Sequence, residues 1–422
     1  MTLLDFIPSL QHAAPSRIDP AVWPITARVD ECGRLCVGGV PLPDVADEFG
    51  TPAYVIDEND FRRRARRYRT VLRDAEIVYA GKPLLTTAVA RWVREEGLGL
   101  GVCSSGELAT ALVGGVDPAR IIMHGNVKTP GELREAAAVG VGRIVVDSST
   151  EIALLACEVS RPQRVLLRMT SEGLDAMGVT RVMNQPLLDL VGLHCHIGSQ
   201  VVDASLYGEA IRRMIGAMAD IRTTHGVVLT ELNIGGGHAV PYIRRDPELN
   251  LTELADSIDD ALDAACAAER FPRPRVVVEP GRAISARAGV TLYRVVSVQT
   301  QAGGRTVVGV DGGMSDNPRV GLYGAKYTVT LANRHSLAST RSVTVAGRHC
   351  EAGDEIARDV ELPTDVHPGD LLAVACTGAY HHGMASNYNL VGRPPVVAVS
   401  DGRPREIVRR ETIADLLSRD CG

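Results

Sequence analysis

The stretch Ile77-Val78-Tyr79-Ala80-Gly81-Lys82 is an apolar run that ends in a lysine, and seven further apolar runs follow it along the chain. Those runs end near positions 102, 124, 147, 168, 196, 235 and 279, with helical patterns between them. Short apolar runs that alternate with helical patterns indicate βα units. Eight such units over about 210 residues predict a closed (β/α)8 barrel rather than an open sheet.

A change in the sequence pattern past Ala283 predicts a second domain. Alternating runs such as 290–296 and 371–375 are interrupted by Gly and Pro turns, which is typical of β structure. We therefore predict a barrel over residues 49–285 and a C-terminal β domain over 286–422. An N-terminal extension over residues 1–48 is expected to add strands to that β domain.

The composition argues against a nucleic-acid or membrane partner. The net charge is −6 and no basic stripe stands out. No apolar run approaches the roughly 18 residues of a membrane helix. Residues 1–5 lack the basic segment of a secretory signal, and nine cysteines without paired spacing fit reduced thiols. We expect a cytoplasmic enzyme.

Lysine is rare in this chain, because only Lys82, Lys128 and Lys326 are lysines among 45 basic residues. A lysine amine can be desolvated and made nucleophilic, which arginine does not allow. The active sites of such barrels lie where the strands end. Lys82 is therefore a candidate nucleophile, and an ordinary strand-end charge is the alternative.

Glycines and polar residues at other strand ends predict a phosphate site. The triplet 235–237 lets backbone amides approach an anion, and Ser199 and the turn Gly281-Arg282 follow neighbouring strands. Phosphate often binds late in such barrels. With Lys82 and the carboxylate of Glu279, this pattern predicts pyridoxal phosphate. The lysine binds the cofactor, the glycines hold its phosphate, and the carboxylate keeps its ring nitrogen protonated.

A metal site is the alternative for the same strand ends. His194 and His196 are two residues apart on a strand and face the same side. A metal would need further ligands, for which His124, Asp147 and His238 are available. Lys82, the phosphate site and Glu279 together favour the cofactor over a metal-dependent hydrolase, so we predict no metal.

The order of the motifs resembles the fold-type III pyridoxal-phosphate decarboxylases, and most closely the bacterial diaminopimelate decarboxylases, along nearly the whole chain. The motifs are Tyr79-Ala80-Gly81-Lys82, Ser105-Gly106-Glu107-Leu108, His194-Cys195-His196-Ile197-Gly198-Ser199-Gln200, Gly235-Gly236-Gly237, Glu279-Pro280-Gly281-Arg282, Asp311-Gly312-Gly313-Met314-Ser315-Asp316-Asn317, Gly347-Arg348-His349-Cys350-Glu351, Thr377-Gly378-Ala379-Tyr380 and Met384-Ala385-Ser386-Asn387-Tyr388-Asn389. The resemblance implies an α/β fold like those of alanine racemase and ornithine decarboxylase, with a cofactor-binding barrel and a β domain.

The resemblance also implies a role for each residue of the cofactor site. Lys82 would form the Schiff base, His196 would stack on the pyridine ring, and Glu279 would pair with the ring nitrogen. The residues around the phosphate would be Ser199, Gly236, Gly237, Gly281 and Arg282. Tyr380 would close the site and reach cofactor and substrate.

A head-to-tail homodimer with shared active sites is a further implication. Cys350 of the partner subunit would protonate the substrate carbanion, and Glu351 of the partner subunit would contact the substrate amine. Arg319 and Tyr323 match the residues that hold the distal carboxylate of the substrate. A planar guanidinium can bind a carboxylate through two parallel hydrogen bonds. Arg282 would also reach the substrate. The implied reaction converts meso-diaminopimelate to L-lysine and carbon dioxide, in lysine biosynthesis.

Three departures from the family pattern leave the substrate open. Gly101 stands where the family usually has an aspartate, residues 169–178 are shorter than the family's loop, and His381 follows Tyr380 in place of a cysteine. These changes leave two alternatives. One is a related decarboxylase or racemase that acts on another amino acid in a specialised pathway, and the other is a cofactor-binding protein without turnover.

Overall fold

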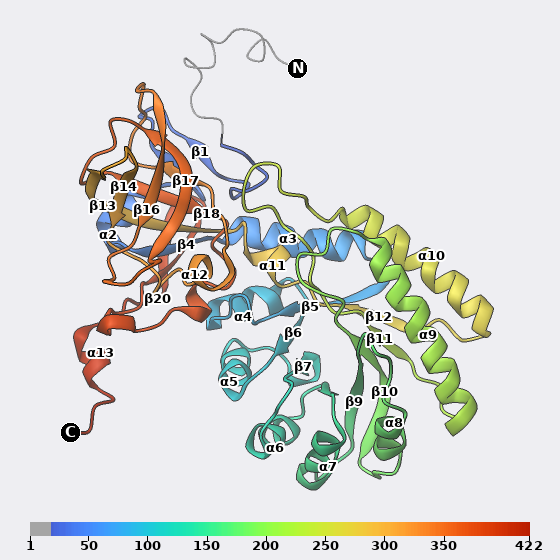
Figure 1. The fold of residues 1–422 in the computed structure, drawn as a ribbon. Helices are drawn as coiled ribbons and strands as arrows, with labels where there is room; N and C mark the ends of the chain where they lie inside the picture. Colours follow the sequence, from blue (N-terminus) through green and yellow to red (C-terminus); the bar gives the residue numbers. More distant parts are fainter. Residues whose placement is uncertain (1–17) are drawn as a thin grey trace. The chain divides into compact units, whose positions relative to one another are not determined.

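The computed structural model describes residues 18–422, which divide into two units (Figure 1). The first unit joins the described residues up to Phe61 with 241–246 and 285–422, and the second comprises 62–240 and 247–284. Residues 49–61 and 241–246 fall in the range predicted for the barrel, yet they belong to the first unit. For the former segment the reason is β4 (Ala53–Asp57), which pairs with strands of the first unit's sheet. Residues 1–17 of the predicted N-terminal extension lie outside the described residues.

A closed parallel barrel forms the second unit, as predicted from the eight apolar runs. Its strands are β5 (Ala75–Ala80), β6 (Gly99–Val102), β7 (Ile121–Met123), β8 (Arg143–Val146), β9 (Gln163–Met169), β10 (Leu188–Cys195), β11 (Glu231–Asn233) and β12 (Arg275–Val278). Each strand is parallel to its neighbours, and β12 pairs with β5 to close the barrel. Closure brings all the C-terminal strand ends to one mouth.

Helices follow the barrel strands and lie outside them (Figure 1). They are α4 (Thr87–Glu95), α5 (Ser105–Val113), α6 (Pro130–Val139), α7 (Ser149–Glu158), α8 (Ala176–Met183), α9 (Ser205–His225) and α10 (Leu251–Glu269), with α3 (Glu58–Val71) preceding β5. Hydroxyl caps begin several of them. For example, Ser104 accepts from the amide of Glu107 at 3.2 Å at the start of α5. No helix within 18–422 is both long enough and apolar enough to span a membrane.

Side chains inside the barrel lie in layers, because successive residues of a strand alternate between its two faces. The middle layer is apolar and consists of Val78, Ile122, Val145, Leu166, Val191 and Val277. Two residues earlier on the strands, the alternation places Glu76 and Arg143 towards the N-terminal end. Two residues later it places His124 and Glu279 towards the mouth. Charge therefore lies above and below an apolar layer.

Buried ion pairs fill the N-terminal end of the barrel. The Arg143 guanidinium lies 2.5 Å from Glu76 Oε2 and 2.7 Å from Glu231 Oε2. Arg164 and Arg275 also pair with Glu231. Burial by itself raises the pKa of the Glu76 carboxyl, but its hydrogen bond to Arg143 and the charge of Arg143 hold that pKa below its ordinary value. Glu76 therefore stays ionised, because the charge of Arg143 outweighs its burial.

The first unit is built on a long antiparallel strand, β13 (Gly289–Thr300). This strand pairs with β4, β14 and β18. The other strands of the sheet are β14 (Thr306–Val310), β15 (Val329–Leu331), β16 (Thr340–Ala346), β17 (Glu355–Pro363), β18 (Leu371–Ala375), β19 (Val396–Ser400) and β20 (Arg403–Val408). The predicted β domain is therefore present.

The described part of the predicted N-terminal extension forms a small sheet of its own. It consists of β1 (Arg28–Val29), β2 (Leu35–Val37) and β3 (Val40–Pro41), followed by α2 (Leu42–Phe49). These strands pair with one another and not with the larger sheet. The amide of Leu35 donates to the carbonyl of Ala332 at 2.9 Å, which attaches the small sheet to the first unit.

Arg143 is expected to be essential for the stability of the barrel. Arg143→Met takes from the carboxylates of Glu76 and Glu231 their buried arginine partner and leaves them the half-exposed Arg164 and Arg275. Removing one member of a buried ion pair costs about 3–5 kcal/mol. Arg134→Met is the matched control, because Arg134 is 64% exposed in its pair with Glu158 and exposed pairs contribute about 0–1 kcal/mol. Thermal and urea unfolding measure both variants. Equal midpoints for the two would contradict a structural role for the buried pairs.

Candidate active site

The barrel mouth carries the predicted lysine. Lys82 follows Gly81, whose N–H donates to the carbonyl of Gly101 at 2.8 Å, at the ends of β5 and β6. The side chain of Lys82 is exposed. The glycine at position 81 allows this close approach of two strand ends, since a Cβ there would lie 3.0 Å from the Gly101 oxygen. Lys82 is thus positioned by backbone contacts between adjacent strands.

Glu279 lies just beyond the end of β12 and is buried. Its Oε1 atom lies 2.8 Å from His124 Nε2 and 3.1 Å from Asn233 Nδ2, and both nitrogens donate to it. Burial by itself raises the pKa of Glu279, but His124 above all, and then His194, hold that pKa well below its usual range. Glu279 is therefore a carboxylate, although it is inside the barrel.

His194 is a further buried residue beside Glu279. Its Nε2 atom lies 3.6 Å from Glu279 Oε2. Burial lowers the pKa of His194 to about 4, so the imidazole is neutral at pH 7. A donor atom from each of His124, His194 and Glu279 lies within 4.8 Å of the others. This set could hold a metal ion by its chemistry.

The histidine pair of the metal hypothesis does not act as one unit. His196 is exposed, whereas His194 is buried against Glu279. His238, which follows the glycine triplet in the sequence, is buried, and its Nδ1 atom lies 2.7 Å from the Tyr68 hydroxyl. Three of the predicted metal ligands, Asp147, His196 and His238, therefore lie outside the group that the structure brings together.

The glycine triplet makes a tight turn after β11. Gly235 and Gly237 have φ values of +67° and +91°, which favour glycine. A Cβ at Gly236 would lie 2.1 Å from the carbonyl oxygen of Glu279, and one at Gly237 would lie 2.0 Å from that of Gly198. Side chains are therefore excluded from this turn. Among residues 18–422, no hydrogen-bond acceptor lies within reach of the N–H groups of Gly236 and Gly237.

The other predicted phosphate ligands lie at neighbouring strand ends. Arg282 begins α11 (Arg282–Ser285) and donates to Ser199 Oγ at 3.2 Å. Gly281 precedes it, and a Cβ there would lie 2.8 Å from the ring of Pro83. Ser199 belongs to the segment between β10 and α9. The barrel therefore brings Ser199 and Arg282 into contact, as the sequence predicted for two members of one site.

In the first unit, Arg319 is held by tyrosines. It begins α12 (Arg319–Tyr323) and is buried. Its guanidinium donates to the Tyr327 hydroxyl at 2.7 Å and lies 5.1 Å from the ring centre of Tyr242 and 5.8 Å from that of Tyr380. These contacts fix the plane of the guanidinium. The structure therefore brings Arg319 and Tyr380 together.

Cys350 and Glu351 lie in the turn between β16 and β17 and are exposed. Asp354 holds this turn, because its carboxylate accepts from the amides of His349 at 2.7 Å and Met314 at 2.6 Å. The hydroxyl of Tyr388 donates to Glu351 Oε2 at 2.7 Å. The turn is thus rigidly attached to its own unit while it presents a thiol and a carboxylate to the outside.

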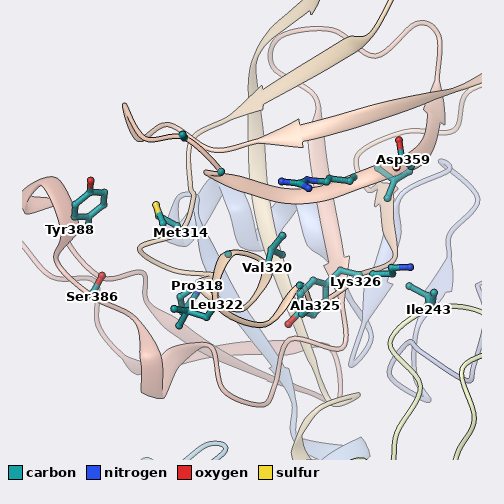
Figure 2. A pocket seen from close by; sticks show the side chains of 17 residues that line it. Ile243, Met314, Pro318, Val320, Leu322, Ala325, Lys326, Asp359, Ser386 and Tyr388 are labelled. Carbon is teal, nitrogen blue, oxygen red and sulfur yellow. The ribbon is translucent and has the colours of Figure 1, made fainter.

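A hollow of about 1010 Å³ lies beside α12 in the first unit (Figure 2). Met314, Val320, Leu322, Lys326 and Tyr388 are among its lining residues (Figure 2). Leu322 is 62% exposed, and its neighbour Tyr323, the predicted substrate residue, is 66% exposed. The hollow therefore has an apolar and solvent-facing rim.

Three functional candidates were given no role from the sequence: Asn233, Tyr327 and Tyr388. Asn233 had a local signal, since it is a polar residue inside the apolar run before the glycine triplet. Tyr388 stands in the motif at residues 384–389, which carried no role for it, and Tyr327 had no signal. Their partners Glu351 and Arg319 are 37 and 8 residues away. Those contacts depend on the fold.

The departures from the family pattern differ in where they lie. A Cβ at Gly101 would lie 3.5 Å from the His124 ring, so this position faces His124, the partner of Glu279. His381 is buried and packs edge-on against the Tyr327 ring at 5.3 Å, behind Arg319. The short segment 169–178 and the helices α8 and α9 line a separate hollow of about 580 Å³. The first two departures adjoin the predicted cofactor and substrate residues.

Known proteins match this chain over its whole length. Residues 58–177 and 173–286 match the family described as "Pyridoxal-dependent decarboxylase, pyridoxal binding domain". The diaminopimelate decarboxylase of Actinosynnema pretiosum subsp. auranticum is 49% identical, with all of both chains covered. That of Mycobacterium tuberculosis is 42% identical, with 97% of this chain and 98% of the relative covered.

The chain belongs to the diaminopimelate decarboxylase family of pyridoxal-dependent decarboxylases.

Solved structures of the family agree with this membership. The crystal structure of diaminopimelate decarboxylase from M. jannaschii in complex with L-lysine has a TM-score of 0.88 and 28% identity, over 94% of this chain and 98% of that chain. The predictions of the family, the fold, a carboxy-lyase and pyridoxal phosphate are confirmed. The alternatives of a metal-dependent hydrolase and of a cofactor-binding protein without turnover lose their support.

The residues of the barrel mouth fit pyridoxal phosphate. Glu279 is a buried carboxylate with a depressed pKa, which suits a protonated ring nitrogen. Within the described part of the chain, the N–H groups of Gly236 and Gly237 donate to no protein acceptor, which suits a phosphate. Lys82 supplies an exposed amine at the same mouth. The cofactor therefore has a chemically matched partner for each of its polar ends.

Proposed function

We propose that this enzyme removes the carboxylate at the D-centre of meso-diaminopimelate and releases L-lysine and carbon dioxide. The observation that carries the proposal is the buried, ionised Glu279 at a barrel mouth that also presents Lys82 and the glycine turn. Full-length relatives at 42–49% identity bear the name diaminopimelate decarboxylase. A location in the cytoplasm stays a prediction.

The barrel residues are proposed to bind the cofactor and to keep its ring nitrogen protonated. When bound, pyridoxal phosphate accepts the electrons left on Cα as carbon dioxide leaves. Lys82 would hold the cofactor through its amine, and Glu279 would keep the ring nitrogen protonated. His196 stacks on the ring. The phosphate ligands are Ser199, Gly236, Gly237, Gly281 and Arg282.

Residues of the first unit are proposed to hold the substrate and supply the proton. Arg319 binds the distal carboxylate, with Tyr323 beside it, and Glu351 binds the amine at the same end. The Cys350 thiol donates a proton to Cα, which replaces the lost carboxylate, and regains a proton from solvent. Tyr380 closes the site.

A homodimer with shared active sites is part of the proposal. Cys350 and Glu351 project from an exposed turn. Leu322 and Tyr388 line the nearby hollow with exposed apolar surface, and Tyr323 next to Leu322 is exposed as well. Exposed apolar patches of this kind mark protein interfaces. We infer that a second copy of the chain covers this surface, so that Cys350 and Glu351 serve the partner's barrel.

A decarboxylase for another amino acid remains the second candidate. The short segment 169–178 is the observation that favours it, because the family's longer loop contributes near the substrate. The buried Arg319 favours diaminopimelate, since a distal carboxylate is what a fixed guanidinium binds best.

Purified full-length protein with pyridoxal phosphate and meso-diaminopimelate is expected to form L-lysine and carbon dioxide in equal amounts. Lys82→Ala is expected to lower kcat by about 10³-fold or more, because the group that binds the cofactor is lost. Mass spectrometry and carbon dioxide release measure both. If the absorbance of bound cofactor is present and no lysine forms, the cofactor site stands and the substrate assignment is wrong. A panel of D- and L-amino acids then identifies the substrate.

Arg319→Met is expected to lower kcat/KM for meso-diaminopimelate by on the order of 10²-fold, because a charged hydrogen-bond partner is lost. D-lysine keeps the D-centre and lacks the distal carboxylate, so its kcat/KM is expected to change little. Arg305→Met is the control, since Arg305 pairs with Glu355 on the sheet surface. An equal loss with both substrates would rule out recognition of the distal carboxylate.

Heterodimers of Lys82→Ala and Cys350→Ala chains test the shared site. Each variant alone is expected to be nearly inactive. A heterodimer isolated with two affinity tags is expected to regain about half of the wild-type activity, because one of its two sites has both residues intact. Lys82→Ala paired with the Lys82→Ala/Cys350→Ala double variant is the control. Activity that stays at the level of this control would mean that Cys350 serves its own chain.

A further inference from the structure

Asn233 lies between the two predicted ends of the cofactor site. It is the last residue of β11 and is 0% exposed. Its Nδ2 atom donates to Glu279 Oε1 at 3.1 Å, and its Oδ1 atom accepts from the amide of Gly235 at 2.9 Å. One buried amide therefore touches both the carboxylate proposed for the ring nitrogen and the turn proposed for the phosphate.

The second donor to Glu279 comes from another strand. His124 Nε2 also lies 2.8 Å from Glu279 Oε1, and it must carry the hydrogen because an ionised carboxylate only accepts. Gly101 on the neighbouring strand leaves the adjoining space without a side chain. Both donors thus bind the same oxygen of Glu279.

This arrangement fixes the direction of the other oxygen, Oε2. A carboxylate held by two donors at one oxygen cannot turn about its terminal bond without losing a hydrogen bond. Among the described residues, His194 Nε2 approaches Oε2 only to 3.6 Å, beyond hydrogen-bond distance. Oε2 is therefore able to accept a hydrogen bond from the protonated ring nitrogen of the cofactor.

We propose that Asn233 is a positioning residue that holds the Glu279 carboxylate and the glycine turn in one fixed relation. The cofactor is rigid, so its ring nitrogen and phosphate bind well only if these two partners are correctly spaced. This inference rests on the proposed role of Glu279 and extends it to a residue that itself contacts no reacting atom.

A purely structural role for Asn233 is the competing interpretation. Val277, the residue of β12 that pairs with Asn233, is apolar and belongs to the middle layer of the barrel. A buried amide costs free energy unless its polar atoms are bonded. A valine or leucine would satisfy a packing role without that cost, and the amide bonds only groups of the proposed cofactor site.

Two variants of the full-length enzyme separate the two bonds of Asn233. Asn233→Asp keeps an acceptor for the Gly235 amide but replaces the donor to Glu279 with a second carboxylate. Two adjacent carboxylates share a proton, so Glu279 loses its full charge. Asn233→Leu removes both bonds. Gln163→Leu is the matched control, because Gln163 is a buried barrel amide that bonds the carbonyls of Val141 and Arg164.

The readouts are the dissociation constant of pyridoxal phosphate and the pH at which the absorbance of the bound cofactor changes. Asn233→Leu is expected to weaken cofactor binding by on the order of 10–100-fold, since bonds to two groups are lost. Asn233→Asp is expected to shift the pH midpoint by about one unit or more to lower pH, with a smaller loss of affinity. Gln163→Leu is expected to lower thermal stability and leave both readouts unchanged.

Wild-type affinity and an unchanged pH midpoint in both Asn233 variants would overturn the inference. Glu279→Gln serves as the reference for the proposed function. If Glu279→Gln also leaves the pH midpoint unchanged, the assigned role of Glu279 is wrong, and the failure lies there. If Glu279→Gln moves the midpoint and the Asn233 variants do not, only the role of Asn233 is wrong. Neither readout requires substrate.

Discussion

The ionised carboxylate of Glu279 inside an apolar barrel is the constraint on which the site depends. A buried carboxylate without partners would take up a proton, and a neutral acid could not keep a ring nitrogen protonated. The chain meets this constraint with His124, directly after β7, and Asn233, the last residue of β11, both of which bond one oxygen. The mouth therefore holds a negative charge before any ligand arrives, as a preorganised site requires.

The two ends of the barrel use charge for different purposes. At the N-terminal end, Arg143 and Glu76 neutralise each other, and that end holds the strands together. At the mouth, Glu279 is bonded at one oxygen only, and Lys82 is exposed. The apolar middle layer separates the two groups. The same strands can therefore carry ion pairs that stabilise the barrel at one end and the candidate active site at the other.

The first unit arranges its candidate residues in a different way. Arg319 is buried and fixed by tyrosines, whereas Cys350 and Glu351 project from an exposed turn that Asp354 holds from behind. A fixed guanidinium favours recognition of one carboxylate geometry. The exposed thiol of Cys350 and carboxylate of Glu351 on a rigid turn suit the proposal that they act in the active site of a partner subunit. The two arrangements agree with a substrate that is held at both ends.

Much of the fold and of the site was predictable from the sequence, because strand ends and glycine turns are local features. Eight apolar runs predicted the barrel, and Lys82, the glycine triplet and Glu279 each stand directly after one of them. The membership of β4 in the first unit was not predictable, because an apolar strand carries no mark of the sheet that it joins. The bonds of Asn233 to Glu279 and of Tyr388 to Glu351 join residues 46 and 37 positions apart, and only tertiary packing brings such donors and acceptors together.

The sequence by itself therefore determined which chemical groups stand at the strand ends. The tertiary structure decided which of them are buried, bonded and charged, since burial and partners set a pKa and neither is written in local sequence.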